Sequence, residues 1–258
     1  VKYNTTCPFV EKVWTRAENL GKENCTIVIH GKAQHEETRA TFSHTVRNTK
    51  AIVIRNLEEA EYLSKIILGE EEIEEFYEFF SGKYSPGFKV DSDLVRLGVV
   101  NQTTMLAGET QAIADLLRET MITKYGEENI KEHFADTRDT LCYATNDNQS
   151  ATMSLMQLNA DLAIVVGGYN SSNTTHLVEL LEQKFPTYYI SDADKIVSDK
   201  VIHHFNTQSH VEIVSESYLP QKRPIIIAVT SGASCPDSIV DQSLTKLLSF
   251  FDDVKNFE

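Results

Sequence analysis

Short runs of apolar residues, most of them β-branched, recur along the chain between longer stretches in which apolar residues return every three or four positions. The short runs are typical of buried parallel strands, and the longer stretches are typical of amphipathic helices. The predicted strands cover residues 26–29, 51–54, 95–100, 162–166, 188–190 and 224–229. The predicted helices cover residues 8–20, 35–42, 57–68, 107–124, 146–158, 172–184, 193–205 and 237–251. This alternation predicts an α/β fold with parallel sheets and right-handed crossovers.

A few segments depart from the alternation. Residues 69–93 are acidic and aromatic, and we expect a helix and a loop packed on the outside, an insertion and not a site. Residues 127–140 are expected to bridge two halves of the chain, and residues 211–218 to form a connecting segment. The tail after residue 252 is expected to fray, as chain ends commonly do.

One arrangement occurs twice. Cys7 begins a helix that leads to an apolar strand and a polar turn, and Cys142 does the same in the second half of the chain. The two cysteines are 135 residues apart, and the glycines that follow the two strands, Gly31 and Gly167, are 136 apart. We interpret the chain as two copies of one α/β unit, residues 1–139 and 140–258, each with one cysteine.

Each unit carries two polar turns, one after its first strand and one after its last. Ligands of such folds bind beyond the carboxyl ends of the strands, so we expect the four turns to face one site. The candidate site residues in the turns and helix starts are Cys7, His35, Glu37, Thr103, Cys142, Ser171, Ser172, Asn173 and Ser234. Hydroxyls, amides and backbone N–H groups at helix starts suit a phosphate or diphosphate. A histidine beside a carboxylate suits proton transfer.

Every candidate has a structural alternative. Serine and asparagine before a helix are most often N-caps, and Thr103 and Ser234 are open to the same interpretation. Cys7 and Cys142 are also consistent with buried structural thiols, although the positive end of a helix stabilises a thiolate. We interpret the histidines outside the turns as surface or capping residues: His44, His133, His176, His203, His204 and His210. The coincidence of four polar turns with two matched cysteines favours the functional interpretation.

Net charge, cysteine spacing and the length of apolar runs argue against several classes of protein. The formal net charge of −14 over 258 residues argues against a nucleic-acid surface, which needs clustered Lys and Arg. The four cysteines include no CxxC pair, so a zinc knuckle is not expected. We find neither a signal peptide nor an apolar run of the roughly 20 residues that cross a membrane, and we expect a cytoplasmic protein. The chain starts at Val1 without methionine and reaches a motif almost at once, so we expect a segment upstream.

Six motifs, in order along the chain, resemble the 4-hydroxy-3-methylbut-2-enyl diphosphate reductases, the LytB-type family of the non-mevalonate isoprenoid pathway. They are TCPFVEKV at 6–13, HGKAQHEET at 30–38, NQTT at 101–104, LCYATN at 141–146, GYNSSN at 168–173 and TSGASCPD at 230–237. The resemblance implies a pseudo-threefold trefoil of α/β units around a [4Fe–4S] cluster, each unit giving one cysteine. Nothing in this chain matches the family's N-terminal unit, which carries a cysteine and two substrate-contacting histidines. The third cluster cysteine is therefore expected upstream of Val1.

The resemblance also implies roles for the candidate residues. Cys7 and Cys142 would be two of three thiolate ligands of the cluster, and Cys235 matches no ligand position. His35, Ser171, Ser172, Asn173 and Ser234 would hold the diphosphate. Thr103 would lie near the substrate hydroxyl, and Glu37 would donate the proton. The implied reaction is the reductive dehydroxylation of (E)-4-hydroxy-3-methylbut-2-enyl diphosphate to isopentenyl and dimethylallyl diphosphates, with ferredoxin or flavodoxin as electron donor. A non-catalytic diphosphate-binding α/β module is the alternative.

Overall fold

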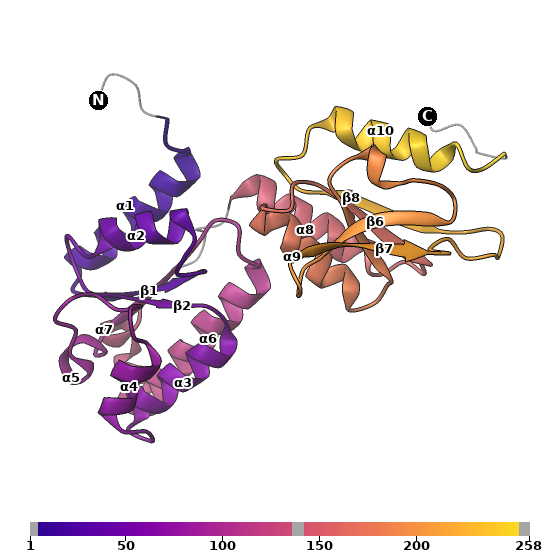
Figure 1. The fold of residues 1–258 in the computed structure, drawn as a ribbon. Coiled ribbons are helices and arrows are strands. Elements are labelled where there is room, and N and C mark those ends of the chain that lie inside the picture. Colours follow the sequence, from indigo (N-terminus) through magenta and orange to yellow (C-terminus); the bar gives the residue numbers. More distant parts are fainter. Residues whose placement is uncertain (1–4, 136–141, 253–258) are drawn as a thin grey trace. The chain divides into compact units, whose positions relative to one another are not determined.

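The chain folds into two compact units, Val1–Cys142 and Tyr143–Glu258, each described here by itself (Figure 1). The computed structural model describes residues 5–135 and 142–252. The predicted boundary at residues 139–140 and the predicted frayed tail after residue 252 lie outside these residues. Among the described residues, no helix has both the length and the apolarity needed to cross a membrane.

The first unit is built on a parallel sheet of three strands in the order β2-β1-β3. These strands are β1 (Thr26–His30), β2 (Ala51–Ile54) and β3 (Leu97–Asn101). Every residue of the three strands is buried, because helices cover both faces of the sheet. This explains why the strands are continuous apolar runs and not alternating ones.

Four helices form these covering layers. Helices α1 (Pro8–Lys22) and α2 (Glu36–Thr45) cover one face of the sheet, and α3 (Leu57–Leu68) and α6 (Ala107–Tyr125) cover the other (Figure 1). Alternate residues of β1 point to the two layers: Ile27 and Ile29 pack with Val13 and Ala17 of α1, and Val28 packs on the α3 side. A short 3₁₀ turn (Glu127–Asn129) and α7 (Ile130–His133) follow α6.

The acidic aromatic segment 69–93 forms two short helices, α4 (Ile73–Phe79) and α5 (Val90–Asp93). The prediction that it packs on the outside is wrong. Phe76, Phe80 and Phe88 are buried in the core, because Phe76 and Phe80 lie one helical turn apart on the face opposite the glutamates. The loop beyond α4 runs along the outer edge of β2, where Val53 N donates to Lys83 O (2.7 Å) and Ser85 N donates to Ala51 O (2.9 Å).

The second unit has the same sheet topology. Its parallel strands β4 (Leu162–Val166), β5 (Thr187–Ile190) and β8 (Ile227–Ser231) lie in the order β5-β4-β8. Helices α8 (Tyr143–Leu155) and α9 (Ser172–Glu182) pack on one face, and α10 (Asp237–Leu248) packs on the other. The α/β class and the parallel sheets predicted from the sequence are confirmed, and the two sheets share one strand order.

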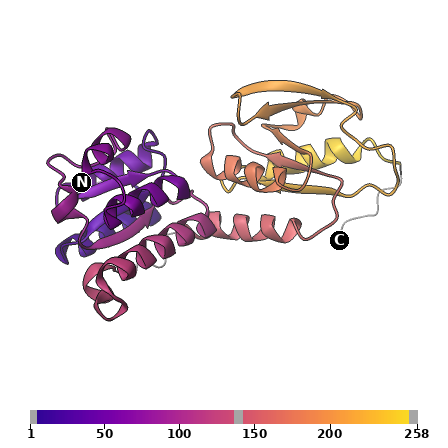
Figure 2. The ribbon, with the colours of Figure 1, turned by 90° about the horizontal axis from the view of Figure 1, so that it is seen from below.

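The predicted helix at residues 193–205 is wrong, and so is the predicted connection at 211–218. Residues Ala193–Lys195 form a 3₁₀ turn, and β6 (Val201–Asn206) and β7 (Val211–Glu216) form an antiparallel hairpin. In Figure 2 the hairpin, drawn in orange, lies along the margin of its unit. The side chain of Asn206 closes the hairpin loop by accepting hydrogen bonds from the backbone N–H groups of Gln208 and Ser209. Pairing between the strands therefore prevails over the helix-like spacing of Val197, Val201 and Phe205.

Candidate functional site

In the first unit, the polar turns after β1 and β3 meet because these strands are neighbours in the sheet. The backbone N–H of Gln102 donates to the carbonyl of His30 (2.8 Å), and the backbone N–H of Lys32 donates to Gln102 Oε1 (3.2 Å). The two turns are thus joined by direct hydrogen bonds at the carboxyl edge of the sheet.

Glu37 and Thr103 form the closest contact across these turns. Glu37 Oε1 accepts a hydrogen bond from the backbone N–H of Thr103 (2.6 Å), and Glu37 Oε2 accepts one from the Thr103 hydroxyl (2.9 Å). Burial raises the pKa of the Glu37 carboxyl, although both Thr103 hydrogen bonds act in the opposite direction. The pair therefore combines a carboxyl group that accepts a proton more readily than usual with a hydroxyl that can pass one on.

His35 is the N-cap of α2, and its Nδ1 accepts a hydrogen bond from the backbone N–H of Glu37 (3.3 Å). This contact fixes the imidazole beside the turn and orients the first residues of α2. The prediction of a helix starting near His35 is therefore confirmed, with His35 as its cap and Glu37 as its second residue.

Gln102 holds the turns together, and sequence reasoning assigned it no role. It is buried; its Oε1 accepts from the Thr38 hydroxyl (2.9 Å), and its Nε2 donates to the Thr104 hydroxyl (2.6 Å). Gly31 packs against the same group, since a Cβ at this position would lie 2.6 Å from Thr38 Oγ1. The signal available in the sequence was the position of Gln102 between Asn101 and Thr103 in a polar turn.

In the second unit, the turn after β4 leads directly into α9. The backbone N–H of Ser171 donates to Gly168 O (2.9 Å), which closes the turn. Ser171 Oγ accepts from the backbone N–H of Thr174 (3.3 Å), so Ser171 is the N-cap of α9. The capping interpretation is confirmed for Ser171, and its hydroxyl proton remains able to donate to an anion. Ser172 is the first residue of the helix and is half-buried.

Asn173 differs from its neighbours because its side-chain amide is buried without a hydrogen-bond partner. The residue is 4% exposed, and neither Oδ1 nor Nδ2 makes a hydrogen bond with any residue that the structure describes. Buried amides are almost always paired, so an unpaired one at the positive end of a helix is well suited to a ligand.

Ser234 lies in the turn after β8, beside β4. The backbone N–H of Gly232 donates to Val166 O (3.0 Å), which ties this turn to the turn after β4. Ser234 itself is exposed. Burial raises the pKa of the neighbouring Cys235 thiol, which disfavours the thiolate that a metal ligand requires.

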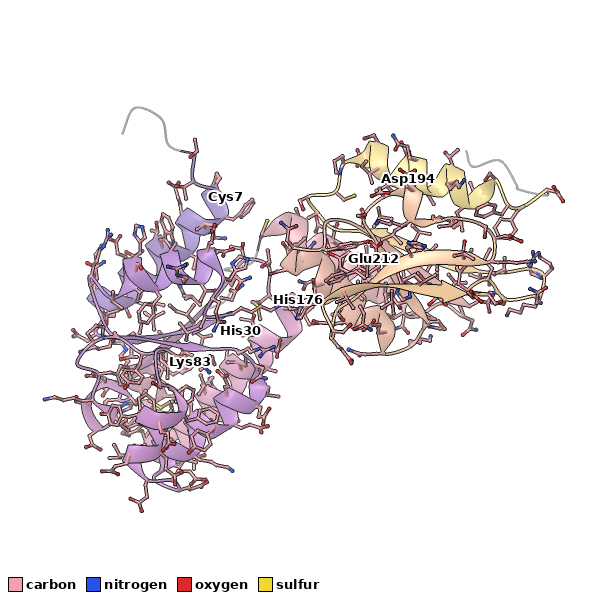
Figure 3. All side chains as sticks on the ribbon, in the orientation of Figure 1. Cys7, His30, Lys83, His176, Asp194 and Glu212 are labelled. Carbon is pink, nitrogen blue, oxygen red and sulfur yellow. The ribbon has the colours of Figure 1, made fainter. Side chains whose placement is uncertain are left out.

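The two matched cysteines both lie at helix starts. Cys7 is exposed and is the N-cap of α1 (Figure 3), and Cys142 is half-buried immediately before α8. The first helix of each unit therefore has one of the two matched thiols at its N-terminal end. No group of three or more His, Cys, Asp or Glu suited to a metal is found among residues 5–135 and 142–252.

Two histidines contradict the surface interpretation. His176 is 4% exposed on α9, where Nδ1 pairs with Glu179 Oε2 (2.8 Å) and Nε2 has no partner in the described part of the chain. His204 is 9% exposed on β6 and bonds Ser215 Oγ (2.8 Å). His176 lies three residues after Asn173, so the two side chains share one face of the helix. This spacing was the signal that sequence reasoning overlooked.

The candidate residues thus form two groups. In the first unit, His35, Glu37 and Thr103 lie together. In the second unit, Ser171, Ser172 and Asn173 lie together at the start of α9. The turn that carries Ser234 is hydrogen-bonded to the end of β4 in the same unit.

Comparisons with known proteins agree with one another. A protein-family model described as LytB protein matches residues 1–248. A 4-hydroxy-3-methylbut-2-enyl diphosphate reductase of Cyanothece sp. is 44% identical over 247 residues, which cover 95% of this chain and 60% of the relative. A protein of the same name from Thermosynechococcus vestitus is 47% identical, with the same coverage. The chain therefore spans about 60% of the length of these curated relatives.

A solved structure shares the fold. The E-1-hydroxy-2-methyl-but-2-enyl-4-diphosphate reductase from Plasmodium falciparum superposes with a TM-score of 0.58 at 21% identity. The match covers 94% of this chain and 58% of that structure. The two α/β units thus correspond to part of a larger known fold.

Proposed function

The chain belongs to the LytB protein family, and from this premise we propose that it forms two of the three α/β units of a 4-hydroxy-3-methylbut-2-enyl diphosphate reductase. The shared strand order of the two sheets supports their interpretation as repeats of a pseudo-threefold trefoil. The remaining unit lies upstream of Val1 in this proposal, in keeping with relatives of which the chain spans about 60%.

The proposed reaction removes the hydroxyl group of (E)-4-hydroxy-3-methylbut-2-enyl diphosphate. Two electrons and two protons are consumed, the carbon–oxygen bond breaks, and water leaves together with isopentenyl or dimethylallyl diphosphate. The electrons come from an external one-electron donor of the ferredoxin or flavodoxin class. The residues of this chain then have two tasks, which are to hold the diphosphate and to deliver a proton to the leaving oxygen.

Cys7 and Cys142 would hold a [4Fe–4S] cluster together with a third cysteine from upstream. When bound, such a cluster supplies electron transfer and a Lewis-acidic iron for the substrate hydroxyl. The position of both thiols at helix N-termini supports this assignment.

The start of α9 would hold the diphosphate. Ser171 and Ser172 offer hydroxyl donors at the positive end of the helix, and the unpaired amide of Asn173 offers a donor that is already desolvated. Ser234 and the imidazole of His35 would complete the set of donors. A dianionic or trianionic ligand needs such a concentration of donors in a chain whose net charge is −14.

The contact between Glu37 and Thr103 is the observation that carries the proposal. A protonated Glu37 would donate to Thr103 Oγ1, and the Thr103 hydroxyl would donate in turn to the leaving oxygen. The half-buried position of Glu37 supports this role, because desolvation raises the pKa of the carboxyl and so favours its protonated form.

Iron content tests the proposal and separates it from a non-catalytic diphosphate-binding module. We expect a chain extended by the N-terminal part of its longer relatives to bind about four irons after anaerobic reconstitution and to reduce the substrate. Cys142→Ser should abolish cluster binding in that protein, and Cys235→Ser should not. The 258-residue chain alone supplies two of the three proposed thiolates, and we expect it to retain no intact cluster. A colourless extended protein that still binds diphosphate would favour the module.

A further inference from the structure

The β6–β7 hairpin contacts the proposed diphosphate-binding turn through one residue, Tyr169. Tyr169 is the second residue of the four-residue turn that Ser171 N closes on Gly168 O. Its ring stacks on Phe205 of β6 with centroids 4.6 Å apart and planes 15° apart. The same ring meets Tyr189 edge-on at 5.1 Å. The side chain at the corner of the turn therefore packs in a cluster of three aromatic rings, Tyr169, Tyr189 and Phe205.

The hydroxyl of Tyr169 is held by the other strand of the hairpin. Tyr169 Oη donates to Glu212 Oε2 (3.2 Å), and Glu212 also pairs with Lys195 Nζ (2.6 Å). This ion pair lowers the pKa of the Glu212 carboxyl, so Glu212 is ionised and an acceptor at neutral pH. Figure 3 labels Glu212 on the hairpin.

One cross-strand pair provides both contacts. Phe205 and Glu212 lie directly opposite each other in the β6–β7 register, so their side chains share one face of the hairpin. Phe205 fixes the plane of the Tyr169 ring, and Glu212 fixes its hydroxyl. Much of β7 is otherwise exposed, with Val211 at 51% and Val214 at 56%, so the hairpin contributes little to the core through this strand.

A further hydrogen bond holds the backbone of the turn at Gly168. The hydroxyl of Tyr189 donates to Gly168 O (2.5 Å), the carbonyl that also accepts the Ser171 N–H. A shift of Tyr169 would move Gly168 and Ser171 together, and with them the first residues of α9. These contacts link the hairpin to the turn that carries Ser171 and leads to Asn173.

We propose that the β6–β7 hairpin sets the geometry of the anion-binding start of α9, with Tyr169 and Glu212 as positioning residues. This inference rests on the proposed function, since it assumes a diphosphate at Ser171–Asn173. Neither residue touches the ligand; each acts by holding the turn in which the ligand groups lie.

Titration of the 258-residue chain with inorganic pyrophosphate tests the inference. We expect Tyr169→Phe, which keeps the stacked ring, and Glu212→Ala to weaken binding each by about fivefold, the effect of one hydrogen bond. The double variant should lose little more than either single variant, because the Tyr169–Glu212 bond is common to both. Glu212→Gln keeps an acceptor for the tyrosine hydroxyl and should restore most of the affinity. Glu216→Ala, an exposed glutamate on the same strand, is the matched control and should bind normally.

The outcomes separate this inference from the proposed site. If Asn173→Ala weakens pyrophosphate binding while Tyr169→Phe and Glu212→Ala bind as the unaltered chain does, the site stands and the positioning role is wrong. A lower melting temperature with unchanged affinity would likewise make the hairpin structural only. If the unaltered chain binds no pyrophosphate, both the site and the positioning role are overturned.

Discussion

Glu37 and Asn173 occupy the same position in the two units, since each is the second residue of the helix that follows the first strand of its sheet. Their environments differ. The Glu37 carboxylate is paired with Thr103, whereas the Asn173 amide is buried without a partner. In the proposed function, one repeated position would therefore serve as a proton donor in one unit and as a ligand-binding group in the other.

The role of Glu37 predicts a loss of turnover without a loss of binding. In the N-terminally extended enzyme, Glu37→Gln should lower kcat by about 100-fold, the usual scale for a lost general acid, and leave KM nearly unchanged. Steady-state kinetics under anaerobic conditions measure both. Glu36→Gln removes the same charge from the exposed preceding residue and should remain active. Near-normal kcat with lowered stability in the Glu37 variant would make this residue structural.

The half-buried position of Glu37 also predicts how stability depends on pH. Burial raises the pKa of Glu37 above its usual 4.5, so the favourable contribution of the neutral carboxyl is fully present below pH 4.5 and is lost as pH rises through the folded-state pKa. Glu37→Gln cannot ionise and should escape this loss. The stability of the variant relative to the unaltered chain should therefore increase between pH 4.5 and neutral pH, as measured by urea unfolding. A difference that is constant with pH, or that shrinks, would contradict the raised pKa.

The unpaired amide of Asn173 predicts a specific loss of anion affinity. Asn173→Ala should weaken binding of pyrophosphate to the 258-residue chain by about tenfold or more, because a donor to a charged ligand is removed. Since the amide makes no hydrogen bond within residues 5–135 and 142–252, the melting temperature should change little. Asn170→Ala, three residues earlier and exposed, is the control. Equal affinity in all three proteins, measured by calorimetry, would remove Asn173 from the site.

Close packing at Gly232 predicts a stability effect. A Cβ at Gly232 would collide with the Thr174 hydroxyl and lie 3.1 Å from the Thr174 Cβ. Gly232→Ala should therefore reduce the free energy of unfolding by about 1–3 kcal/mol, the usual scale of overpacking. Thr174→Ala in the same chain should recover part of this loss by vacating the space. An additive double variant would show that the two positions do not interact.

The strands of both sheets were predictable because their short apolar runs are typical of buried parallel strands. Runs such as 26–29 and 162–166 contain only apolar or β-branched residues, which is typical of a strand covered on both faces. The offset of 136 residues between Gly31 and Gly167 likewise predicted a repeat that the shared strand order supports.

The hairpin was not predictable by the same reasoning. Val197, Val201 and Phe205 recur every four residues and mimic a helical face, whereas the outer strand exposes Val211 and Val214 and gives no burial pattern. Pairing between β6 and β7 decides the structure, and periodicity within one segment does not report such pairing. The contact of Glu212 with Tyr169, 43 residues apart, was hidden for the same reason.

The sequence suggests candidate residues for the site but does not show the contacts between them. Polar turns at strand ends identified Glu37 and Thr103 as candidates, but their direct bonds depend on the distance between the ends of β1 and β3. Gln102 was overlooked because a buried amide and an exposed one look alike in a sequence. The lack of a hydrogen-bond partner for the Asn173 amide depends on the residues that surround it in space, and the local sequence pattern does not show them.

The loop that follows α4 has a consequence for how this protein behaves in concentrated solution. Its backbone bonds to Val53 and Ala51 occupy the outer edge of β2, which would otherwise offer free N–H and C=O groups to a strand from another molecule. The loop therefore prevents a strand of another molecule from pairing with β2 at these positions. Phe76 and Phe80 anchor α4 in the core just before this loop, so we expect that loosening them would expose the edge of β2 to strands of other molecules.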